Sequence, residues 1–256
     1  MIVRTDAIVV KSMKYRETSK IVTLYTRSFG KVSVVAKGAR DMKSKFGGAL
    51  EPMTHISAVF YKKPHRELHL ISHADIIEEF HRLHTDYERL NVGYAVIDLL
   101  NSVMHGEEEH PAVYRLLLDT LRAIDGGTKN LVNVLYYYEV HLAALLGFAM
   151  VLDRCGICGA AIGERTDDRI GFNPIQGSMV DERCGGNSDR WIRVSLSSVR
   201  ILQRLSQVAI DGALSIEMSD ASRKNIDTVL RAHFGAHIEA TRRMRSAVTI
   251  RSSIIS

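Results

Sequence analysis

The spacing of apolar residues changes near residue 76, and this change constrains the fold more than any other feature of the chain. Before it, five short segments are rich in Val, Ile, Thr and Tyr and partly alternate with polar residues, which is typical of strands. They cover residues 7–11, 20–26, 31–37, 55–61 and 67–72. After it, apolar residues recur every three to four positions, as on one side of a helix. A β-rich part is therefore predicted to precede a helical part.

Five short strands suit a small closed barrel, in which no strand edge is left open to aggregation. Glycines and Pro64 lie between the strand-like segments and supply the turns. An oligonucleotide-binding (OB) fold fits strands of this number and length. An SH3-like barrel fits nearly as well, so both barrels remain open here.

The helical part is predicted to hold five main helices and one irregular stretch. The helices are expected at residues 87–104, 112–124, 131–150, 196–209 and 222–244. The third is apolar on most sides, which predicts a place at the centre of a bundle. Ser219 or Asp220 is expected to cap the last. The predicted domains are a barrel over 1–78 and a helical domain over 79–256, with a cysteine-containing insertion at 153–190.

Charge divides the chain in the same way. Residues 1–75 hold 14 Lys and Arg against 6 Asp and Glu, a net +8, whereas residues 76–150 hold 5 against 11, a net −6. Residues 151–256 carry a net +3, and the whole chain +5. A basic barrel suits a polyanion, because cations that meet phosphates release condensed counterions. A solvated basic face without a partner has the same composition.

Several function classes lack their sequence signals. The 256 residues contain neither an apolar signal-peptide region nor an apolar run of membrane-spanning length, and three cysteines are too few for a disulfide framework. Phosphate-binding, zinc-protease and hydrolase motifs do not occur. The segment His105-Gly-Glu-Glu-Glu-His110 is interpreted as a solvated acidic connection. We expect a cytoplasmic, nucleoid-associated protein with reduced thiols that is not an enzyme and binds no nucleotide.

Two basic loops of the predicted barrel each combine cations with one aromatic ring. The first carries Lys14 and Arg16 around Tyr15, and the second carries Lys37, Arg40, Lys43 and Lys45 before Phe46. Such loops can follow a phosphate backbone and stack a base. The alternative is that the loops are solvated and their rings pack into the barrel.

The pair Cys155-Gly-Ile-Cys158 has the spacing of a zinc knuckle, in which two thiolates share one tetrahedral Zn²⁺. The second knuckle is incomplete, because Cys184-Gly-Gly-Asn187 ends in an amide, a poor zinc ligand. Asp181, Glu182 or Asp189 is a candidate replacement. The alternatives are a zinc site built on Cys155, Cys158 and Cys184, and a ribbon-shaped hairpin that has lost its metal.

The chain resembles the RecO family of DNA repair proteins. The resemblance lies in the stretch from Tyr137 to Phe148, in Leu152-Asp-Arg-Cys155-Gly-Ile-Cys158-Gly, and in Lys37-Gly-Ala-Arg40 followed by Lys43-Ser44-Lys45. Phe172-Asn-Pro174 also lies where the family approaches its second knuckle. The resemblance implies an α+β protein, with an N-terminal five-stranded OB-fold barrel and a helical domain that carries an inserted zinc-ribbon-like hairpin. Family members often have four zinc ligands, and Asn187 departs from that pattern.

The resemblance also implies a function and partners. A RecO protein is a non-enzymatic recombination mediator that binds single- and double-stranded DNA and anneals complementary strands. With RecR, and often RecF, it helps to load RecA onto DNA coated by the single-stranded-DNA-binding protein. The acidic tail of that protein needs an apolar groove and cations, which we expect near Leu202, Leu205, Leu230 and Phe234 with Arg200, Arg204, Arg231, Arg242 and Arg243. An RNA- or ribosome-associated binding protein is the alternative function.

Overall fold

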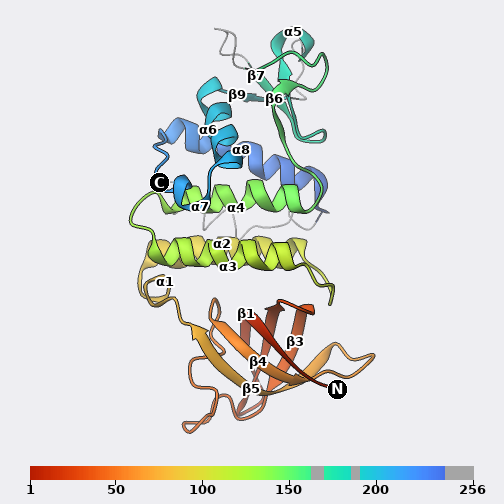
Figure 1. Ribbon diagram of the computed structural model, residues 1–256, viewed down its shortest axis with the longest axis vertical. Coiled ribbons are helices and arrows are strands. Elements are labelled where there is room, and N and C mark those ends of the chain that lie inside the picture. The colour runs from red at the N-terminus through yellow and green to blue at the C-terminus, as the bar shows by residue number, and fades with distance from the viewer. Residues whose placement is uncertain (163–169, 186–190, 240–256) are drawn as a thin grey trace. The chain divides into compact units, whose positions relative to one another are not determined.

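The computed structural model describes residues 1–162, 170–185 and 191–239, and its elements follow the predicted order from strands to helices (Figure 1). The chain packs as two compact units. One comprises Met1–Gly93 and Leu100–Asp125, and the other comprises Tyr94–Leu99 and the described residues from Gly126 onward. The domain boundary expected at residue 78 remains a prediction. Within the described residues, no helix combines the length and the apolar character that crossing a membrane requires.

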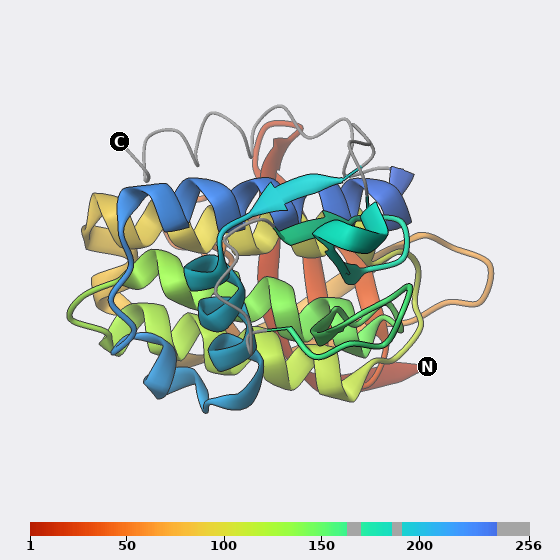
Figure 2. The ribbon, with the colours of Figure 1, turned by 90° about the horizontal axis from the view of Figure 1, so that it is seen from above.

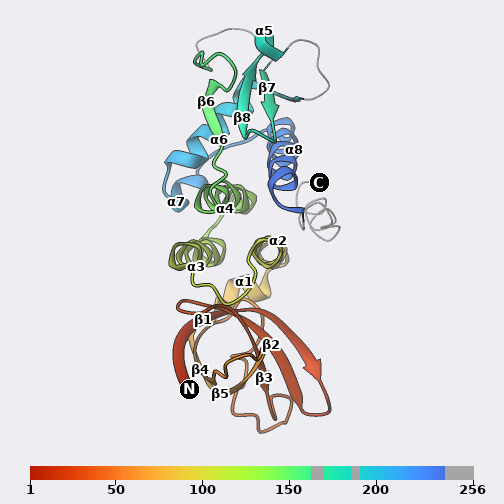
Figure 3. The same cartoon turned by 90° about the vertical axis from the view of Figure 1, so that its right-hand side faces the viewer.

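The first five strands close into a barrel in the order β1-β2-β3-β5-β4 (Figure 3). β3 pairs with β5 in parallel, and the remaining pairs are antiparallel. This arrangement is that of the OB fold, and the predicted barrel is confirmed. The strands are β1 (Ile2–Tyr15), β2 (Ser19–Thr26), β3 (Gly30–Ala36), β4 (His55–Tyr61) and β5 (Leu68–Glu78).

Alternation along the strands builds the barrel core. Val32, Val34 and Ala36 of β3 are fully buried, and the residues between them are only half-buried. β1 is much longer than the predicted segment, because polar residues such as Arg4 and Asp6 also lie in it. Its pairing with β2 shifts by one residue between Val9 and Lys11, as at a β-bulge.

The helices of the first unit are tied to each other and to the barrel by buried polar contacts. They are α1 (His81–Thr85), the two ends of α2 (Tyr87–Val103) and all but the last residue of α3 (Pro111–Gly126). Asp86 caps α2 by accepting from the Arg89 backbone N–H at 3.0 Å. The buried Arg89 guanidinium donates to the carbonyls of Ile124 and Asp125 at the end of α3. The Tyr114 hydroxyl lies 3.0 Å from His55 Nε2 on β4.

The second unit is a helical core that carries a small sheet. α4 (Leu131–Leu145) is buried along most of its length, as predicted, and packs against α6 (Leu196–Gln207), α7 (Ile210–Ala213) and α8 (Asp220–His237). α4 ends five residues earlier than predicted. Gly147 has the left-handed φ of 88°, and the chain then enters a strand at Val151. Ser219 caps α8 by accepting from the Ser222 N–H at 3.2 Å.

The small sheet has the order β6-β8-β7-β9. Its strands are β6 (Val151–Cys155), β7 (Ile170–Asn173), β8 (Ser178–Asp181) and β9 (Ile192–Val194), and the short helix α5 (Glu182–Gly185) directly follows β8. β9 contacts α8, as the view in Figure 2 shows. The predicted cysteine-containing insertion therefore forms a small module of hydrogen-bonded strands.

Candidate nucleic-acid interface and cysteine cluster

The turn between β1 and β2 presents the first pair of predicted cations. Lys14 and Arg16 are exposed, and Arg16 has the left-handed φ of 53°, which makes the turn tight. The Arg16 guanidinium carbon lies 5.2 Å from the centre of the half-buried Tyr15 ring. The turn therefore offers two charges that are free to meet solvent or a polyanion.

The segment between β3 and β4 presents three more exposed lysines, namely Lys37, Lys43 and Lys45. The Lys45 ammonium lies 5.2 Å from the centre of the Phe46 ring. That ring belongs to the barrel core and is only 3% exposed, so it anchors the segment. Of the two readings of this ring, packing into the barrel is the one that the structure supports.

Arg40 joins the two loops. Its Nη1 donates to the carbonyl oxygens of Arg16 at 3.1 Å and Glu17 at 2.7 Å, and its backbone N–H donates to the Thr18 carbonyl at 2.9 Å. These bonds hold the two basic loops side by side. A phosphate contact by Arg40 itself remains a prediction, but its positioning role is visible in the structure.

A strip of outward-facing residues begins beside these loops, on β1, β2 and β3. Strand pairing places Lys11 beside Thr23 and Thr23 beside Ser33, and in the same way aligns Met13, Ile21 and Val35. All six are exposed or half-buried. Cationic, hydroxyl and apolar groups in one strip suit the backbone and the base faces of a nucleic-acid strand.

The loop between β4 and β5 is a further basic segment that the sequence analysis did not single out. It holds Lys62, Lys63, His65 and Arg66, of which the last three are exposed. The sequence signal is the run of basic residues on both sides of Pro64, a position that by itself indicates only a turn between strands. Parallel pairing of β5 with β3 brings the start of β5 next to Ser33, so this loop leads into the same strip.

The three cysteines meet at the edge of the small sheet. Their sulfur atoms lie within 4.8 Å of one another, with Cys155 buried at the end of β6, Cys158 exposed and Cys184 in α5 half-buried. The Cys155 sulfur accepts from the backbone N–H groups of Asp181 at 3.3 Å and Ile157 at 3.5 Å. The three cysteines named as candidate zinc ligands therefore lie together, and zinc binding by them remains a prediction.

The surroundings of Cys155 and Cys184 shift their thiol pKa values in opposite directions. Burial raises the pKa of Cys155, but the N–H donors of Asp181, Cys158 and Ile157 outweigh it and lower the pKa to about 7. The neighbouring Cys158 thiol, followed by burial, raises the pKa of Cys184 to about 11. One thiolate forms readily, and further ones need a cation among them.

Three thiols in this arrangement fit a thiophilic ion such as Zn²⁺. Tetrahedral zinc with Zn–S bonds of about 2.3 Å needs sulfur atoms about 3.8 Å apart, so only a small closure is required. When bound, the ion would cross-link β6 to α5. Asn187 and Asp189 lie outside the described residues. The Asp181 carboxylate accepts from the Arg183 backbone N–H and from Arg183 Nε, at 3.0 and 3.2 Å. The described residues therefore supply three sulfur ligands, one fewer than a closed tetrahedral zinc site has.

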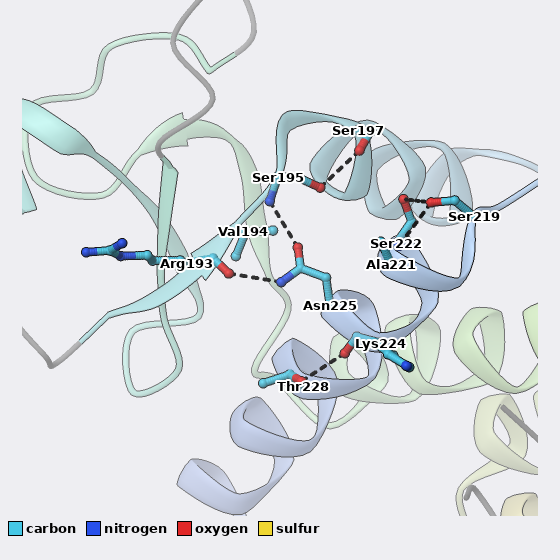
Figure 4. Close-up of a pocket in the computed structure, with 10 residues that line it drawn as sticks. All are labelled: Arg193, Val194, Ser195, Ser197, Ser219, Ala221, Ser222, Lys224, Asn225 and Thr228. Atoms are coloured by element: carbon cyan, nitrogen blue, oxygen red, sulfur yellow. Dashed lines mark hydrogen bonds between the residues drawn. The ribbon is translucent and has the colours of Figure 1, made fainter. Parts of the chain in front are cut away.

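A hydroxyl-rich hollow of about 550 Å³ lies between β9 and the first turns of α6 and α8 (Figure 4). Ser195 and Ser219 cap these helices, and Asn225 accepts from the Ser195 N–H at 3.0 Å and donates to the Arg193 carbonyl at 2.9 Å. The side chains of Arg193 and Lys224 point away from each other. These lining groups bind one another and join β9 to the two helices.

The groove expected for an acidic tail is not formed by the predicted apolar residues. Leu202, Leu205 and Leu230 are fully buried and Phe234 is 3% exposed, because they form the core of the second unit. Arg231 pairs with the buried Asp227 one turn away. Arg242 and Arg243 lie outside the described residues. The periodicity that suggested a groove is the core-facing side of α6 and α8.

Comparison with known proteins covers nearly the whole chain. Residues 1–80 match the family model for the recombination protein O N terminal, and residues 84–246 match that for its C terminal. DNA repair protein RecO of Salinibacter ruber is 33% identical over 230 residues, which span 90% of this chain and 86% of the relative. The RecO protein of Chloroherpeton thalassium is 30% identical over 250 residues, 96% of each chain. With a barrel, a helical core and a cysteine cluster in the expected order, the chain belongs to the RecO family of recombination proteins.

Proposed function

We propose that this protein binds single- and double-stranded DNA through its barrel and anneals complementary strands, as a recombination mediator in DNA repair. The observation that carries the proposal is the pair of basic loops that Arg40 holds together beside the outward strip of β1, β2 and β3. The curated relatives named above are DNA repair proteins. We infer that it acts in the cytoplasm, at the nucleoid, by binding and not by catalysis.

The mechanism follows from the kind of contact that the barrel offers. Lysine and arginine side chains neutralise phosphates without reading sequence, and a strip of hydroxyl and apolar groups meets sugars and base faces. The pairing edges of the bases stay free. Two strands that are each held by their backbones repel one another less, so complementary strands find each other faster.

The proposal includes protein partners. We infer that the protein works with RecR, and with RecF, to load RecA onto DNA coated by the single-stranded-DNA-binding protein, whose acidic tail it contacts. Because the predicted apolar groove is core, the tail would have to use exposed side chains of the helical unit. Arg200 and Arg204 of α6 are exposed and available for its carboxylates.

An annealing assay tests the function. Two complementary labelled DNA oligonucleotides are mixed with the protein, and the duplex is followed by fluorescence transfer, in parallel with an RNA pair of equal length. We expect acceleration of DNA annealing by the native protein and a weaker effect for Lys43→Ala/Lys45→Ala. Acceleration confined to the RNA pair would instead support an RNA-associated role. No acceleration of either pair would contradict the proposal.

A further inference from the structure

The connection between α2 and α3 lies directly on the barrel. We name residues 104–110 the acidic strap, because three consecutive glutamates, Glu107 to Glu109, lie in it. The Lys31 backbone N–H donates to the Gly106 carbonyl at 3.0 Å, and Lys31 Nζ donates to the carbonyls of Asn101 and Met104 at 3.0 and 3.1 Å. This segment was expected to be a solvated acidic connection; residues 105–109 are exposed, as expected, and the structure also shows the segment hydrogen-bonded to the start of β3.

The backbone of the strap lies in close contact with the backbone of the barrel at Gly30. Gly30 has the left-handed φ of 60°, and a Cβ atom there would lie 2.2 Å from the Glu108 carbonyl oxygen. Only glycine leaves room for this contact. The position of the strap is therefore set by the backbone of β3, independently of its charges.

The carboxylate of Glu107 occupies a two-donor site on the barrel. Its Oε2 lies 2.8 Å from Lys62 Nζ and its Oε1 lies 3.0 Å from His69 Nε2. His69 is 1% exposed at its side chain, and its Nδ1 accepts from the Lys63 N–H at 3.4 Å, which assigns the ring proton to Nε2. A lysine and a protonated ring nitrogen thus converge on one anionic group.

The surroundings of this carboxylate are basic. Lys62 Nζ lies 4.7 Å from the centre of the Phe29 ring, and the basic loop Lys62–Arg66 begins at the same point. Burial raises the pKa of Glu107, but the hydrogen bonds from Lys62 and His69 outweigh it, so the carboxyl is held ionised. An internal anion therefore occupies one cation and one neutral N–H donor of the barrel, at the start of the basic loop between β4 and β5.

We propose that Glu107 competes with a nucleic-acid phosphate for Lys62 and His69, so that the acidic strap lowers the affinity of the barrel for DNA. The inference rests on the proposed function, because its ligand is the DNA strand. Release of the carboxylate exposes one further cation to the phosphate backbone. On single strands each additional contact steepens the log–log dependence of affinity on salt by about 0.7.

The test is a fluorescence-anisotropy titration of a labelled single-stranded DNA oligonucleotide at salt concentrations from 50 mM to 1 M. Glu107→Gln keeps the shape of the side chain but removes its charge, and its single amide oxygen can accept from only one of the two donors, Lys62 Nζ or His69 Nε2. We expect this variant to bind about eightfold more tightly at 50 mM, since a slope change of about 0.7 vanishes towards 1 M salt. The matched control is Glu109→Gln, which removes one charge from an exposed strap residue without an ion-pair partner in the described part of the chain. It should leave the slope unchanged.

A second variant separates competition for Lys62 from an indirect effect of Glu107→Gln on folding. Lys62→Ala should cost little affinity in the native background, where Glu107 already neutralises Lys62, and much more in the Glu107→Gln background. Thermal melting confirms that each variant is folded. Equal affinities and slopes for Glu107→Gln and Glu109→Gln, with the native protein still bound to DNA, would overturn the competition alone. Absence of binding by both the native protein and Glu107→Gln would overturn the proposed function together with it.

Discussion

The guanidinium of Arg40 donates to the backbone carbonyl of Arg16 at 3.1 Å, across 24 residues of sequence, and so couples two basic loops that the sequence presents separately. The bond makes Arg40 a positioning residue for its neighbours. Loops that are ordered before binding lose less conformational entropy when they meet a ligand. The affinity of the interface should therefore depend on Arg40 beyond the loss of one charge.

Arg40→Ala should accordingly weaken single-stranded DNA binding more than Lys37→Ala, its matched single-charge control. We expect a loss of about tenfold, because the two bonds to carbonyl oxygens are charge-assisted. Faster hydrogen exchange at the Arg40 and Asp41 amides, which are bonded to Thr18 and Gly38, would accompany it. Equal affinities for both variants with unchanged exchange would show that Arg40 does not order the loops.

The cysteine cluster should bind close to one zinc ion per chain. Chelation should lower the melting temperature, and Cys155→Ser should lose the metal. Asn187→Cys should raise zinc affinity, because a thiolate replaces a neutral amide. Ser197→Cys, at the start of α6, is the control for an added thiol. Elemental analysis and thermal melting measure these effects; a zinc-free protein whose stability is indifferent to Cys155→Ser would contradict them.

Gly30→Ala should destabilise the barrel more than Gly47→Ala. Both glycines have a left-handed φ, so both substitutions carry about 1 kcal/mol of backbone strain. Only at Gly30 does the new Cβ meet the Glu108 backbone, whereas nothing lies within 4 Å at Gly47. We expect a further loss of at least about 1 kcal/mol in the free energy of unfolding. Equal losses in the free energy of unfolding, measured by urea denaturation, would show that the strap moves away from a Cβ at residue 30 without destabilising the protein.

Stability should fall as the pH drops below the ordinary histidine range. Burial lowers the pKa of His233, despite its contacts with the carbonyls of Phe148 at 2.7 Å and Pro174 at 3.2 Å, and the neighbouring His237 lowers it further. Burial likewise lowers the pKa values of His55 and His141. The unfolded chain then binds more protons than the folded chain, so the free energy of unfolding decreases below about pH 6.5.

The contribution of one histidine is isolated by His233→Asn. Each such residue adds up to about 1.4 kcal/mol per pH unit to the slope. The variant should show a shallower loss of unfolding free energy between pH 7.5 and 5.5 than the native protein, whatever its absolute stability. His105→Asn, at an exposed position, should keep the native slope. Identical slopes for all three proteins would exclude His233 as a source of the pH dependence.

The barrel was predictable because a strand with one buried face alternates along its length, as β3 does at Val32, Val34 and Ala36. The full length of β1 was not, since Arg4 and Asp6 lie in a strand whose pairing with β4 is fixed by the rest of the barrel. The early end of α4 was also missed. Apolar residues continue past Leu145, but Gly147 turns the chain into β6.

The cysteine cluster followed from local spacing, because a Cys-x-x-Cys pair and one later cysteine limit the geometries that can bring them together. The strap did not. Its contacts join Lys31 to Met104 and His69 to Glu107, separated by 73 and 38 residues, and a run of glutamates gives no sign of which cation it meets. Arg40 illustrates the same limit, since its hydrogen bonds to a distant loop are invisible in composition.

The most direct test of the central claim is the salt dependence of single-stranded DNA binding by the native protein and by Lys43→Ala/Lys45→Ala. Four to six phosphate contacts predict a log–log slope of roughly −3 to −4, and loss of two lysines should flatten it by about one unit or more. Lys129→Ala/Lys224→Ala removes two charges from the helical unit and should leave the slope unchanged. Equal slopes and affinities for the native protein and the Lys43/Lys45 variant would contradict a DNA interface at these loops.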